Sequence, residues 1–544
     1  MRGPVPTTEV MASRREQMFP ALSAAQMARV ERFATRRQVA AGEILFDAGD
    51  YHPPFFVVVE GSVEIVHPHE GGEELVVVHE AGEFTGEISM LAGRRGLVRG
   101  RALTDSVVLK VEPPSFRTLV QTDSEIGEVL MRAFILRRMG LLASNLGDVV
   151  LVGSRHSAAT LRVQEFLSRN GHPYRYVDVE LDPTVESLLS GFHVQASDVP
   201  IVICRGERVL KNPSNAEVAE TLGFNAAIDI AVLRDVIVVG AGPAGLSAAV
   251  YAASEGLDVL IVEASSPGGQ AGSSSKIENY LGFPTGISGE ALANRALNQA
   301  EKFGAQISVA RRATTLHCAK QPYGIELEGG EIVHARTIVI ATGVQYRKLD
   351  VANLDRYEGV GVYYGATYIE AQRCESDEVI VIGGGNSAGQ AATFLARSSK
   401  HVHVLIRGMG LAASMSRYLS RRIEDTPNIT LHTGTRVVAL EGDAALERVT
   451  WEDTAGERSV HAIRHVFSMA GASPNTEWLA GCLQLDPNGF VLTGTDIQTD
   501  APAGSALGGH RMPYLFETSL PGVFAVGDVR ANSVKRVASA VGEG

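Results

Sequence analysis

Short apolar runs alternate with polar stretches along the whole chain, and the spacing of the apolar positions changes along it. Residues 55–59, 62–66 and 75–78 are apolar runs separated by glycine-containing turns, a pattern typical of a β-roll or barrel. Residues 123–144 carry apolar positions at helical spacing and predict a long helix. From residue 148 onward, apolar strands alternate with helices, which is typical of α/β folds. The pattern therefore predicts several domains, in keeping with a length of 544 residues.

Two glycine-rich segments each follow a run that predicts a buried parallel strand. Residues 240–245 (Gly-Ala-Gly-Pro-Ala-Gly) follow Val-Ile-Val-Val, and residues 383–388 (Gly-Gly-Gly-Asn-Ser-Ala) follow Val-Ile-Val-Ile. A helix-forming stretch comes next in both places, so the amides at the helix start can bind a pyrophosphate. Glu263 ends a strand 18 residues after Gly245, where a carboxylate can bind an adenosine ribose. These two fingerprints predict two dinucleotide cofactors and electron transfer between them.

Further segments after residue 235 resemble the low-molecular-weight thioredoxin reductases, a family of flavoproteins. They are Gly268-Gly269-Gln270 with residues 277–280 (Ile-Glu-Asn-Tyr), residues 341–343 (Ala-Thr-Gly), residues 471–476, and residues 522–528 (Gly-Val-Phe-Ala-Val-Gly-Asp). The resemblance extends to the end of the sequence. It implies FAD on the first fingerprint and NAD(P)H on the second.

The resemblance also implies which residues hold each cofactor. Asp528 would bind the ribityl hydroxyls, and a positive charge from Lys535 or Arg536 would stabilise the reduced flavin. The residues expected at FAD are Gly240, Gly242, Pro243, Ala244, Gly245, Glu263, Gly269, Gln270, Asn279, Thr342, Gly343, Gly527, Asp528, Lys535, Arg536 and Val537. Those expected at NAD(P)H are Gly383, Gly385, Asn386, Ser387, Ala388 and Arg407.

The choice of nicotinamide depends on the residues after the strand Val404-Leu405-Ile406. NADPH-specific members of the resembled family carry His-Arg-Arg there, whereas this chain has only Arg407, with Arg417 further on. No acid stands at this place to bind a 2′-hydroxyl, and one guanidinium can bind a 2′-phosphate. We therefore expect NADPH, with NADH as the alternative.

The resembled reductases carry a Cys-Ala-Thr-Cys loop before the second fingerprint, and this chain lacks it. Residues 365–368 (Gly-Ala-Thr-Tyr) stand in its place. Neither glycine nor tyrosine can supply the thiolate that disulfide exchange requires. Two residues are candidates for a catalytic role. Tyr368 is either a cap on the flavin or a core residue, and Cys374 is either a lone redox thiol or a buried structural cysteine.

Residues 148–224 resemble glutaredoxin and thioredoxin in their order of strands and helices. Those folds place Cys-x-x-Cys at the start of the first helix and a cis-proline opposite. Here residues 157–160 (Ser-Ala-Ala-Thr) take the dithiol position, and Pro200 would be the cis-proline. Hydroxyls cannot replace thiols in disulfide exchange, so we expect a binding or structural role.

Residues 82–91 (Gly-Glu-Phe-Thr-Gly-Glu-Ile-Ser-Met-Leu), followed by Arg101-Ala102, resemble the phosphate-binding cassette of cyclic-nucleotide-binding domains. In that cassette Gly86 would cradle the phosphate and Glu87 would accept the ribose hydroxyl. Counting along the cassette puts Gly96 where an arginine would pair with the phosphate, unless Arg94, Arg95 or Arg99 takes its place. Three roles therefore remain open for this domain: it binds a cyclic nucleotide, it binds another small effector, or it only mediates assembly.

Together these patterns predict an N-terminal β-roll with helices, a small thioredoxin-like α/β unit and two Rossmann-like α/β nucleotide-binding domains. The expected bounds are 1–146 for the cyclic-nucleotide-binding-like domain, 147–225 for the thioredoxin-like domain without Cys-x-x-Cys, 232–348 with 472–544 for a discontinuous FAD domain, and 349–471 for the NAD(P)H domain.

The composition limits the classes of partner and the location that we expect for this chain. A net charge of −13 argues against nucleic acid, because phosphate binding needs a basic face. No apolar run is long enough for a membrane span, and the N-terminus lacks the apolar core of a signal peptide. The four cysteines are too widely spaced for a zinc or dithiol motif, so no metal site is predicted and a cytoplasmic location is the default.

The sequence thus predicts an NAD(P)H-dependent flavoprotein oxidoreductase that resembles class II thioredoxin reductases. A hydride would pass from NAD(P)H to FAD and then to an unknown acceptor, a small molecule or a redox protein. The N-terminal domain would regulate the enzyme, and a homodimer is expected. Two alternatives remain open: a thioredoxin-disulfide reductase that uses an unconventional thiol, and a non-catalytic redox or cyclic-nucleotide sensor. The resemblance further implies that the NAD(P)H domain rotates during turnover.

Overall fold

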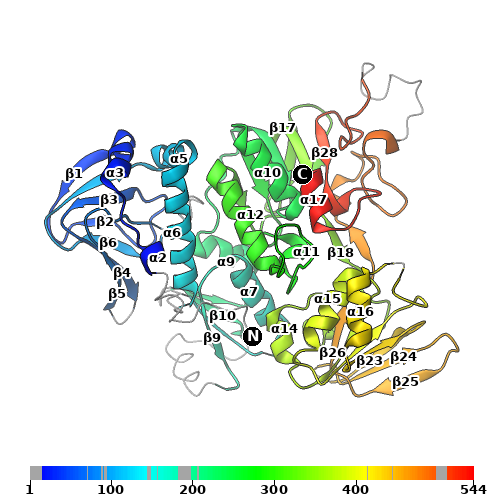
Figure 1. Ribbon diagram of the computed structural model, residues 1–544. Helices are drawn as coiled ribbons and strands as arrows, with labels where there is room; N and C mark the ends of the chain where they lie inside the picture. Colours follow the sequence, from blue (N-terminus) through cyan, green and yellow to red (C-terminus); the bar gives the residue numbers. More distant parts are fainter. Residues whose placement is uncertain are drawn as a thin grey trace.

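The computed structural model describes residues 15–69, 72–86, 90, 95–143, 149–155, 157–181, 198–204, 208–412, 414–443, 445–497 and 511–544. Figure 1 shows a β-roll at one end, separated by the helices α5 and α6 from the α/β units that form the rest of the molecule. The predicted multidomain fold is confirmed.

The N-terminal unit is built from two antiparallel sheets. One has the order β1–β7–β3 and the other β2–β6–β4–β5. Four phenylalanine rings pack between the roll and the helices, with Phe55 and Phe116 at 4.7 Å between ring centroids. The elements are α2 (Arg15–Met18), α3 (Ala24–Val30), η1 (Glu31–Phe33), β1 (Thr35–Val39), β2 (Ile44–Phe46), β3 (Phe55–Glu60), β4 (Val63–His69), β5 (Gly72–His79), β6 (Arg99–Ala102), β7 (Ser106–Val111), α5 (Pro113–Thr122) and α6 (Ser124–Ala143).

The middle unit is a four-stranded sheet with the order β11–β10–β8–β9, in which β8 and β9 run parallel and β10 antiparallel to β8. Ser157 caps the first helix, and the Val199–Pro200 peptide is cis, as predicted. The elements are β8 (Val149–Gly153), α7 (Ala158–Arg169), β9 (Arg175–Asp178), β10 (Ile201–Cys204), β11 (Arg208–Lys211) and α9 (Asn215–Leu222).

The first nucleotide-binding unit has a sheet of the order β14–β13–β12–β17–β16–β15, with β28 added beside β17. The first four strands and β28 pair in parallel, so their carboxyl ends meet at one edge. The elements are β12 (Leu233–Val239), α10 (Pro243–Ser254), β13 (Val259–Val262), α11 (Gly269–Gly272), α12 (Gly289–Phe303), β14 (Gln306–Ser308), β15 (Ala313–His317), β16 (Tyr323–Leu327), β17 (Ile332–Ile340), η3 (Glu477–Leu479), η4 (Gly494–Asp496), β28 (Val523–Ala525), η5 (Gly527–Val529) and α17 (Val537–Glu543).

The second nucleotide-binding unit has five parallel strands in the order β19–β26–β20–β21–β22, and β23–β24–β25 form a separate meander. The elements are α13 (Leu354–Tyr357), β19 (Val362–Tyr363), α14 (Tyr368–Arg373), β20 (Glu378–Ile382), α15 (Asn386–Leu395), β21 (His401–Leu405), α16 (Arg417–Asp425), β22 (Ile429–His432), β23 (Arg436–Glu441), β24 (Arg448–Glu452), β25 (Arg458–His461) and β26 (His465–Ser468). The chain enters and leaves this unit through β18 (Val344–Tyr346) and β27 (Ala472–Pro474), which pair with each other.

The N-terminal unit contacts both neighbouring units. The Arg95 side chain packs on Gly223 at the end of α9, and Arg138 donates to the Gly171 carbonyl at 2.7 Å. Gln121 on α5 donates to the Lys302 carbonyl on α12 at 3.1 Å. The segment that follows the cassette-like loop therefore touches the middle unit directly.

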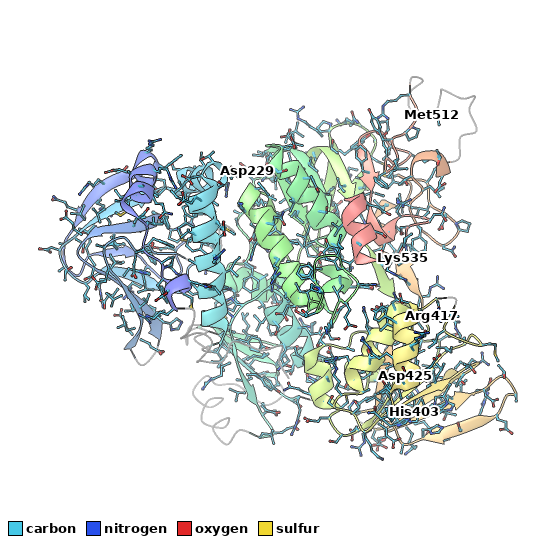
Figure 2. All side chains as sticks on the ribbon, viewed as in Figure 1. Asp229, His403, Arg417, Asp425, Met512 and Lys535 are labelled. Atoms are coloured by element: carbon cyan, nitrogen blue, oxygen red, sulfur yellow. A yellow bond between two sulfur atoms is a disulfide. The ribbon has the colours of Figure 1, made fainter. Side chains whose placement is uncertain are left out.

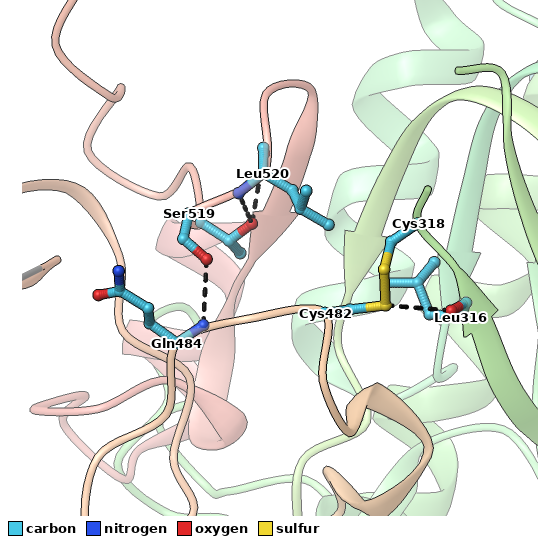
Figure 3. Close-up of a disulfide and its surroundings, with 7 residues drawn as sticks. Leu316, Cys318, Cys482, Gln484, Ser519 and Leu520 are labelled. Carbon is cyan, nitrogen blue, oxygen red and sulfur yellow. Dashed lines mark hydrogen bonds between the residues drawn. A yellow bond between two sulfur atoms is a disulfide. The ribbon is translucent and has the colours of Figure 1, made fainter. Parts of the chain in front are cut away.

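A disulfide between Cys318 and Cys482 links the β15–β16 hairpin to the segment after η3 (Figure 3). The two cysteines lie 164 residues apart in sequence, and spacing alone gave no sign of the pairing. Cys204 and Cys374 are free and buried. Among the helices that the structure describes, none combines the length and apolar character that a bilayer span requires.

We expect the disulfide to stabilise the first nucleotide-binding unit. Replacing both Cys318 and Cys482 by serine should lower the free energy of unfolding by about 2–4 kcal/mol, because the unfolded chain regains the entropy of a long loop. Urea unfolding with and without dithiothreitol measures this. The reductant should lower the midpoint of the wild-type protein but not that of the double variant. A wild-type midpoint that is insensitive to reductant would contradict the expectation.

Candidate functional site

The first fingerprint brings backbone segments unusually close together. Gly240 has a φ of 106°, and a Cβ on Gly245 would lie 1.9 Å from the Gly240 carbonyl oxygen. Helix α10 can therefore start directly above the strand only because both positions are glycine. Gly242 is the N-cap of α10, and its α-carbon faces Gly269, with Pro243 and Ala244 in the first turn. The amides at this helix start point into the space between the two glycine segments.

Glu263 lies at the end of β13 beside the fingerprint. Its carboxylate accepts hydrogen bonds from the Ala241 amide at 2.7 Å and the Ser265 amide at 2.8 Å. Burial raises the pKa of Glu263, while the two amides and the guanidinium of Arg169 lower it. The carboxylate therefore stands where the sequence predicted a ribose ligand.

The loop that begins at Gly268 closes over the first fingerprint. The Gly268 amide donates to the Ala241 carbonyl at 2.8 Å, and the Gln270 side chain donates to the Val344 carbonyl at 2.7 Å. Asn279 is exposed on the same loop. Gln270 thus connects the loop to the strand through which the chain enters the second nucleotide unit.

The two crossing segments are joined by reciprocal hydrogen bonds. The Thr342 hydroxyl donates to the Asn475 carbonyl, and the Asn475 side chain donates to the Thr342 carbonyl, both at 2.8 Å. Gly343, with a φ of 62°, accepts from the Asn475 amide at 3.2 Å. Both predicted residues therefore lie at the junction of the two units.

Asp528 follows Gly527 at the end of β28, on the same edge of the sheet as the fingerprint. Burial raises the pKa of Asp528, and the ammonium of Lys535 opposes this. Lys535 donates to the Asp528 carbonyl at 2.6 Å, and Arg536 is the N-cap of α17, which begins at Val537. Figure 2 shows Lys535 at the side of this unit that faces the second nucleotide unit.

These residues fit an FAD cofactor. A glycine cradle that side chains would fill, a carboxylate at the end of β13 and a second one at the end of β28 match the pyrophosphate, ribose and ribityl groups of a flavin dinucleotide.

The second fingerprint has the same plan. Gly383 has a φ of 139°, and a Cβ on it would lie 2.6 Å from the Met469 carbonyl oxygen. Gly385 is the N-cap of α15 and faces open space, which leaves room for a phosphate. The Asn386 side chain bonds with Ser416 at the start of α16, and Ala388 is fully buried.

Arg407 is exposed just after β21, beside this fingerprint. Arg417 is also exposed, at the first position of α16 (Figure 2). An exposed guanidinium near the end of the second strand can bind a 2′-phosphate.

The second fingerprint faces the FAD-side unit. Tyr346 on β18 lies close to Ser387 at the start of α15 and to Asp528, and both act on its pKa, which burial raises. Arg422 on α16 forms an ion pair with Glu278 at 2.6 Å. These contacts join the unit of the second fingerprint to the loop that covers the first fingerprint.

In the described part of the chain, no thiol takes the place of the missing dithiol. Thr367 caps α14, which begins at Tyr368, whose side chain lies outside the described residues. Cys374 is fully buried, its Sγ donates to the Glu370 carbonyl at 3.4 Å, and burial raises its pKa to about 11. This environment favours the interpretation of Cys374 as a structural cysteine, because a buried neutral thiol is a poor nucleophile.

The cassette-like segment is only partly described. Gly86 has a φ of 104°, and its carbonyl accepts from the buried Arg137 of α6 at 2.8 Å, while Glu87 and Arg94 lie outside the described residues. Arg99 pairs with Asp47 at 2.9 Å and with Glu73 at 2.6 Å. A cyclic phosphate at Arg99 would have to displace these carboxylates.

Comparison with known proteins defines the class. Residues 234–544 match the family model described as pyridine nucleotide-disulphide oxidoreductase, and residues 36–123 match the cyclic nucleotide-binding domain. The first match covers more than half of the chain, so the chain belongs to this family of NAD(P)H-dependent flavoprotein oxidoreductases.

The relatives include thioredoxin reductases from bacteria and plants. Thioredoxin reductase of Streptomyces coelicolor is 32% identical over 314 residues, which is 57% of this chain and 91% of that protein. NADPH-dependent thioredoxin reductase 3 of Arabidopsis thaliana is 30% identical over 322 residues, which is 58% of this chain and 56% of that protein. The structure of Lactococcus lactis thioredoxin reductase in its FR conformation matches with a TM-score of 0.50 and 27% identity, over 57% of this chain and 95% of that one. The predicted NAD(P)H-dependent flavoprotein oxidoreductase is confirmed.

Several residues around the site gave no signal in the sequence. Arg169 and Glu165 of the middle unit reach the two nucleotide units, and Tyr346 reaches the second fingerprint. These contacts join residues far apart in the chain, so no local motif could predict them.

Glu517 is another such residue, and it binds the backbone just before β28, the strand that leads to Asp528. Its fully buried carboxylate pairs with Arg511 at 2.6 Å and accepts from the amides of Tyr514 and Gly522 at 3.0 and 2.9 Å. Although burial raises the pKa, the ion pair and these amides together lower it to about 2.

We expect Glu517→Gln to destabilise the protein at pH 7 by roughly 2–3 kcal/mol, because a lowered pKa in the folded state is a gain in stability for the ionised form. The gain is complete above the ordinary pKa of a glutamate and is lost as the pH falls toward 2. Urea unfolding of both proteins between pH 7 and pH 4 tests this. The difference should shrink with falling pH, and a constant difference would contradict the assignment.

Proposed function

We propose that this chain is an NADPH-dependent flavin reductase whose acceptor takes electrons directly from the flavin rather than through a local disulfide. The observation that supports the proposal is the presence of two nucleotide-binding fingerprints, in units joined by the Arg422–Glu278 ion pair, together with a segment at residues 365–368 that contains neither thiol. When bound, FAD accepts a hydride from the nicotinamide and passes two electrons to an acceptor.

The chain's own residues would bind and orient the two cofactors. The amides at the starts of α10 and α15 would bind the pyrophosphates, with Glu263 at the adenosine ribose and Asp528 at the ribityl chain. Lys535 and Arg536 supply positive charge at the start of α17, where it would stabilise negative charge on the reduced ring.

The experiment that tests this function is anaerobic mixing of the FAD-loaded protein with NADPH or NADH, followed by a panel of acceptors. We expect NADPH to bleach the flavin absorbance, and oxygen, quinones, ferredoxin or flavodoxin to restore it. If neither nicotinamide bleaches the flavin, the proposal is refuted and a role as a sensor is favoured. Turnover of thioredoxin that is abolished by Cys374→Ser would favour the alternative reductase.

Arg407 should set the preference for NADPH. Arg407→Ala should raise KM for NADPH about tenfold and change KM for NADH less than twofold, because only NADPH carries the 2′-phosphate and one charged hydrogen bond contributes about 1.5–3 kcal/mol. Steady-state kinetics with both nicotinamides measure the effect. Arg436→Ala serves as a control, since Arg436 is exposed and pairs with Glu452 on the meander. Equal losses with both nicotinamides would place the 2′-phosphate elsewhere.

Asp528 should be required to retain FAD. Asp528→Ala should weaken FAD binding at least tenfold, because the ribityl hydroxyls would lose a buried charged acceptor. Titration of the apoprotein with FAD measures the Kd. Asp496→Ala is the matched control, since the Asp496 side chain is exposed and accepts a hydrogen bond from Asn532. A Kd that does not change in the Asp528 variant would contradict its assignment.

The N-terminal unit supports a regulatory role for a small effector, and the match to the cyclic nucleotide-binding domain favours that class of ligand. The acceptor side, a homodimeric state and a cytoplasmic location are parts of the same proposal.

A further inference from the structure

We propose that helix α7 of the middle unit is a positioning element of the flavin reductase, which holds the flavin loop through Arg169 and the second nucleotide unit through Glu165. The inference rests on the proposed function. The middle unit would then be kept for its contacts with both halves of the enzyme, although it has lost its dithiol.

Arg169 ends α7 and reaches into the loop that closes the first fingerprint. Its guanidinium donates to the Gly269 carbonyl at 2.8 Å and lies 3.4 Å and 3.5 Å from the carbonyls of Ser266 and Pro267. The neighbouring Asn170 donates to the Ser266 hydroxyl at 3.0 Å. Since Gly269 packs against Gly242 of the fingerprint, Arg169 fixes the backbone that forms one wall of the FAD site.

The charge of Arg169 acts on the same site. It lowers the pKa of Glu263, which burial raises, and it acts in the same direction on Glu290 and Glu165. One guanidinium from the middle unit therefore helps to keep the expected ribose carboxylate ionised. It also holds the loop in place.

One turn earlier, Glu165 faces the second nucleotide unit. Its carboxyl lies close to that of Glu370 on α14, which is 2% exposed, and the charges of Arg169 and Arg373 also act on Glu165. Burial and the neighbouring Glu370 carboxyl raise the pKa of Glu165 to about 9, so Glu165 is protonated at neutral pH. A neutral Glu165 can lie against Glu370, which joins α7 to the helix that begins at the place of the missing dithiol.

Apolar contacts surround this carboxyl pair. Leu161 on α7 belongs to the core cluster of the second unit, with Tyr363 and Ala366. Ala158 packs closely on Gly359, because a Cβ added to Gly359 would lie 2.5 Å from the Cβ of Ala158. Helix α7 thus contributes to the core of one nucleotide unit and to the loop of the other.

A rotation of the second unit would have to separate these contacts and expose the Glu165–Glu370 pair. The resemblance predicted such a rotation, which serves reductases that alternate between a nicotinamide and a dithiol at the flavin. A chain without the dithiol has no need for the second orientation. Helix α7 fastens the units in the orientation in which the second fingerprint faces the flavin side.

The first test compares Arg169→Ala and Arg169→Lys with the control Arg162→Ala. Arg162 lies on the same helix, but it donates to Asn215 and Pro213 within the middle unit. We expect Arg169→Ala to raise the Kd for FAD about tenfold and to slow flavin reduction by NADPH about tenfold in stopped-flow mixing. Arg169→Lys should recover part of both, and Arg162→Ala should change neither. An Arg169→Ala variant with wild-type Kd and wild-type reduction rate would overturn the proposal.

The second test measures hydrogen exchange of α14 in the full-length protein. Glu165→Ala should raise the exchange rate of residues 368–373 about tenfold, whereas Glu165→Gln should not, because glutamine can still donate to Glu370. Equal protection in both variants would overturn the link. Binding of NADPH should leave the protection of α14 in the wild-type protein unchanged, and loss of protection would also overturn it.

These readouts separate the two proposals. If wild-type flavin is not reduced by either nicotinamide, the proposed function fails, while the Kd for FAD and the exchange of α14 still decide whether α7 is a positioning element. If Arg169→Ala fails to fold, Arg169→Lys and the Glu165 variants still test whether α7 is a positioning element.

Discussion

The backbone crossing between the two nucleotide units is the constraint on which the rest of the enzyme depends. Thr342 and Asn475 exchange side-chain hydrogen bonds with each other's backbone, and β18 and β27 pair beside them. A chain that leaves and re-enters a domain through two paired strands can place the inserted domain in only a few orientations. The crossing therefore determines where the second fingerprint can lie. Tyr346, on the crossing strand β18, lies close to Ser387 at the start of α15.

The contacts of the middle unit indicate a structural role for a unit that lacks the dithiol. The middle unit, whose sequence resembles thioredoxin without the dithiol, cannot exchange disulfides through that position, and neither can the segment that starts α14. The two segments that lack the dithiol pack near one another through Leu161 and the Glu165–Glu370 pair. This contact is consistent with a middle unit that holds its neighbours in position.

The sequence predicted most of the fold and the local part of the site. The fingerprints and the cis peptide at Pro200 are local features, because each depends on backbone geometry that only certain residues allow. Arg169, Glu165 and the Cys318–Cys482 pair were missed because they join segments far apart in the chain. In the N-terminal unit, counting along the cassette put Gly96 at the phosphate position. Arg99, one of the alternatives to Gly96, lies on β6 and pairs with Asp47 and Glu73.

The measurement that tests the account most directly is an anaerobic titration of the FAD-loaded protein with NADPH. A flavin that is the only redox centre in contact with the nicotinamide should be fully reduced by one equivalent of NADPH per FAD. Uptake of a second equivalent would reveal another two-electron centre, such as the Cys318–Cys482 disulfide, in contact with the flavin. That result would contradict the claim that electrons leave this enzyme from the flavin itself.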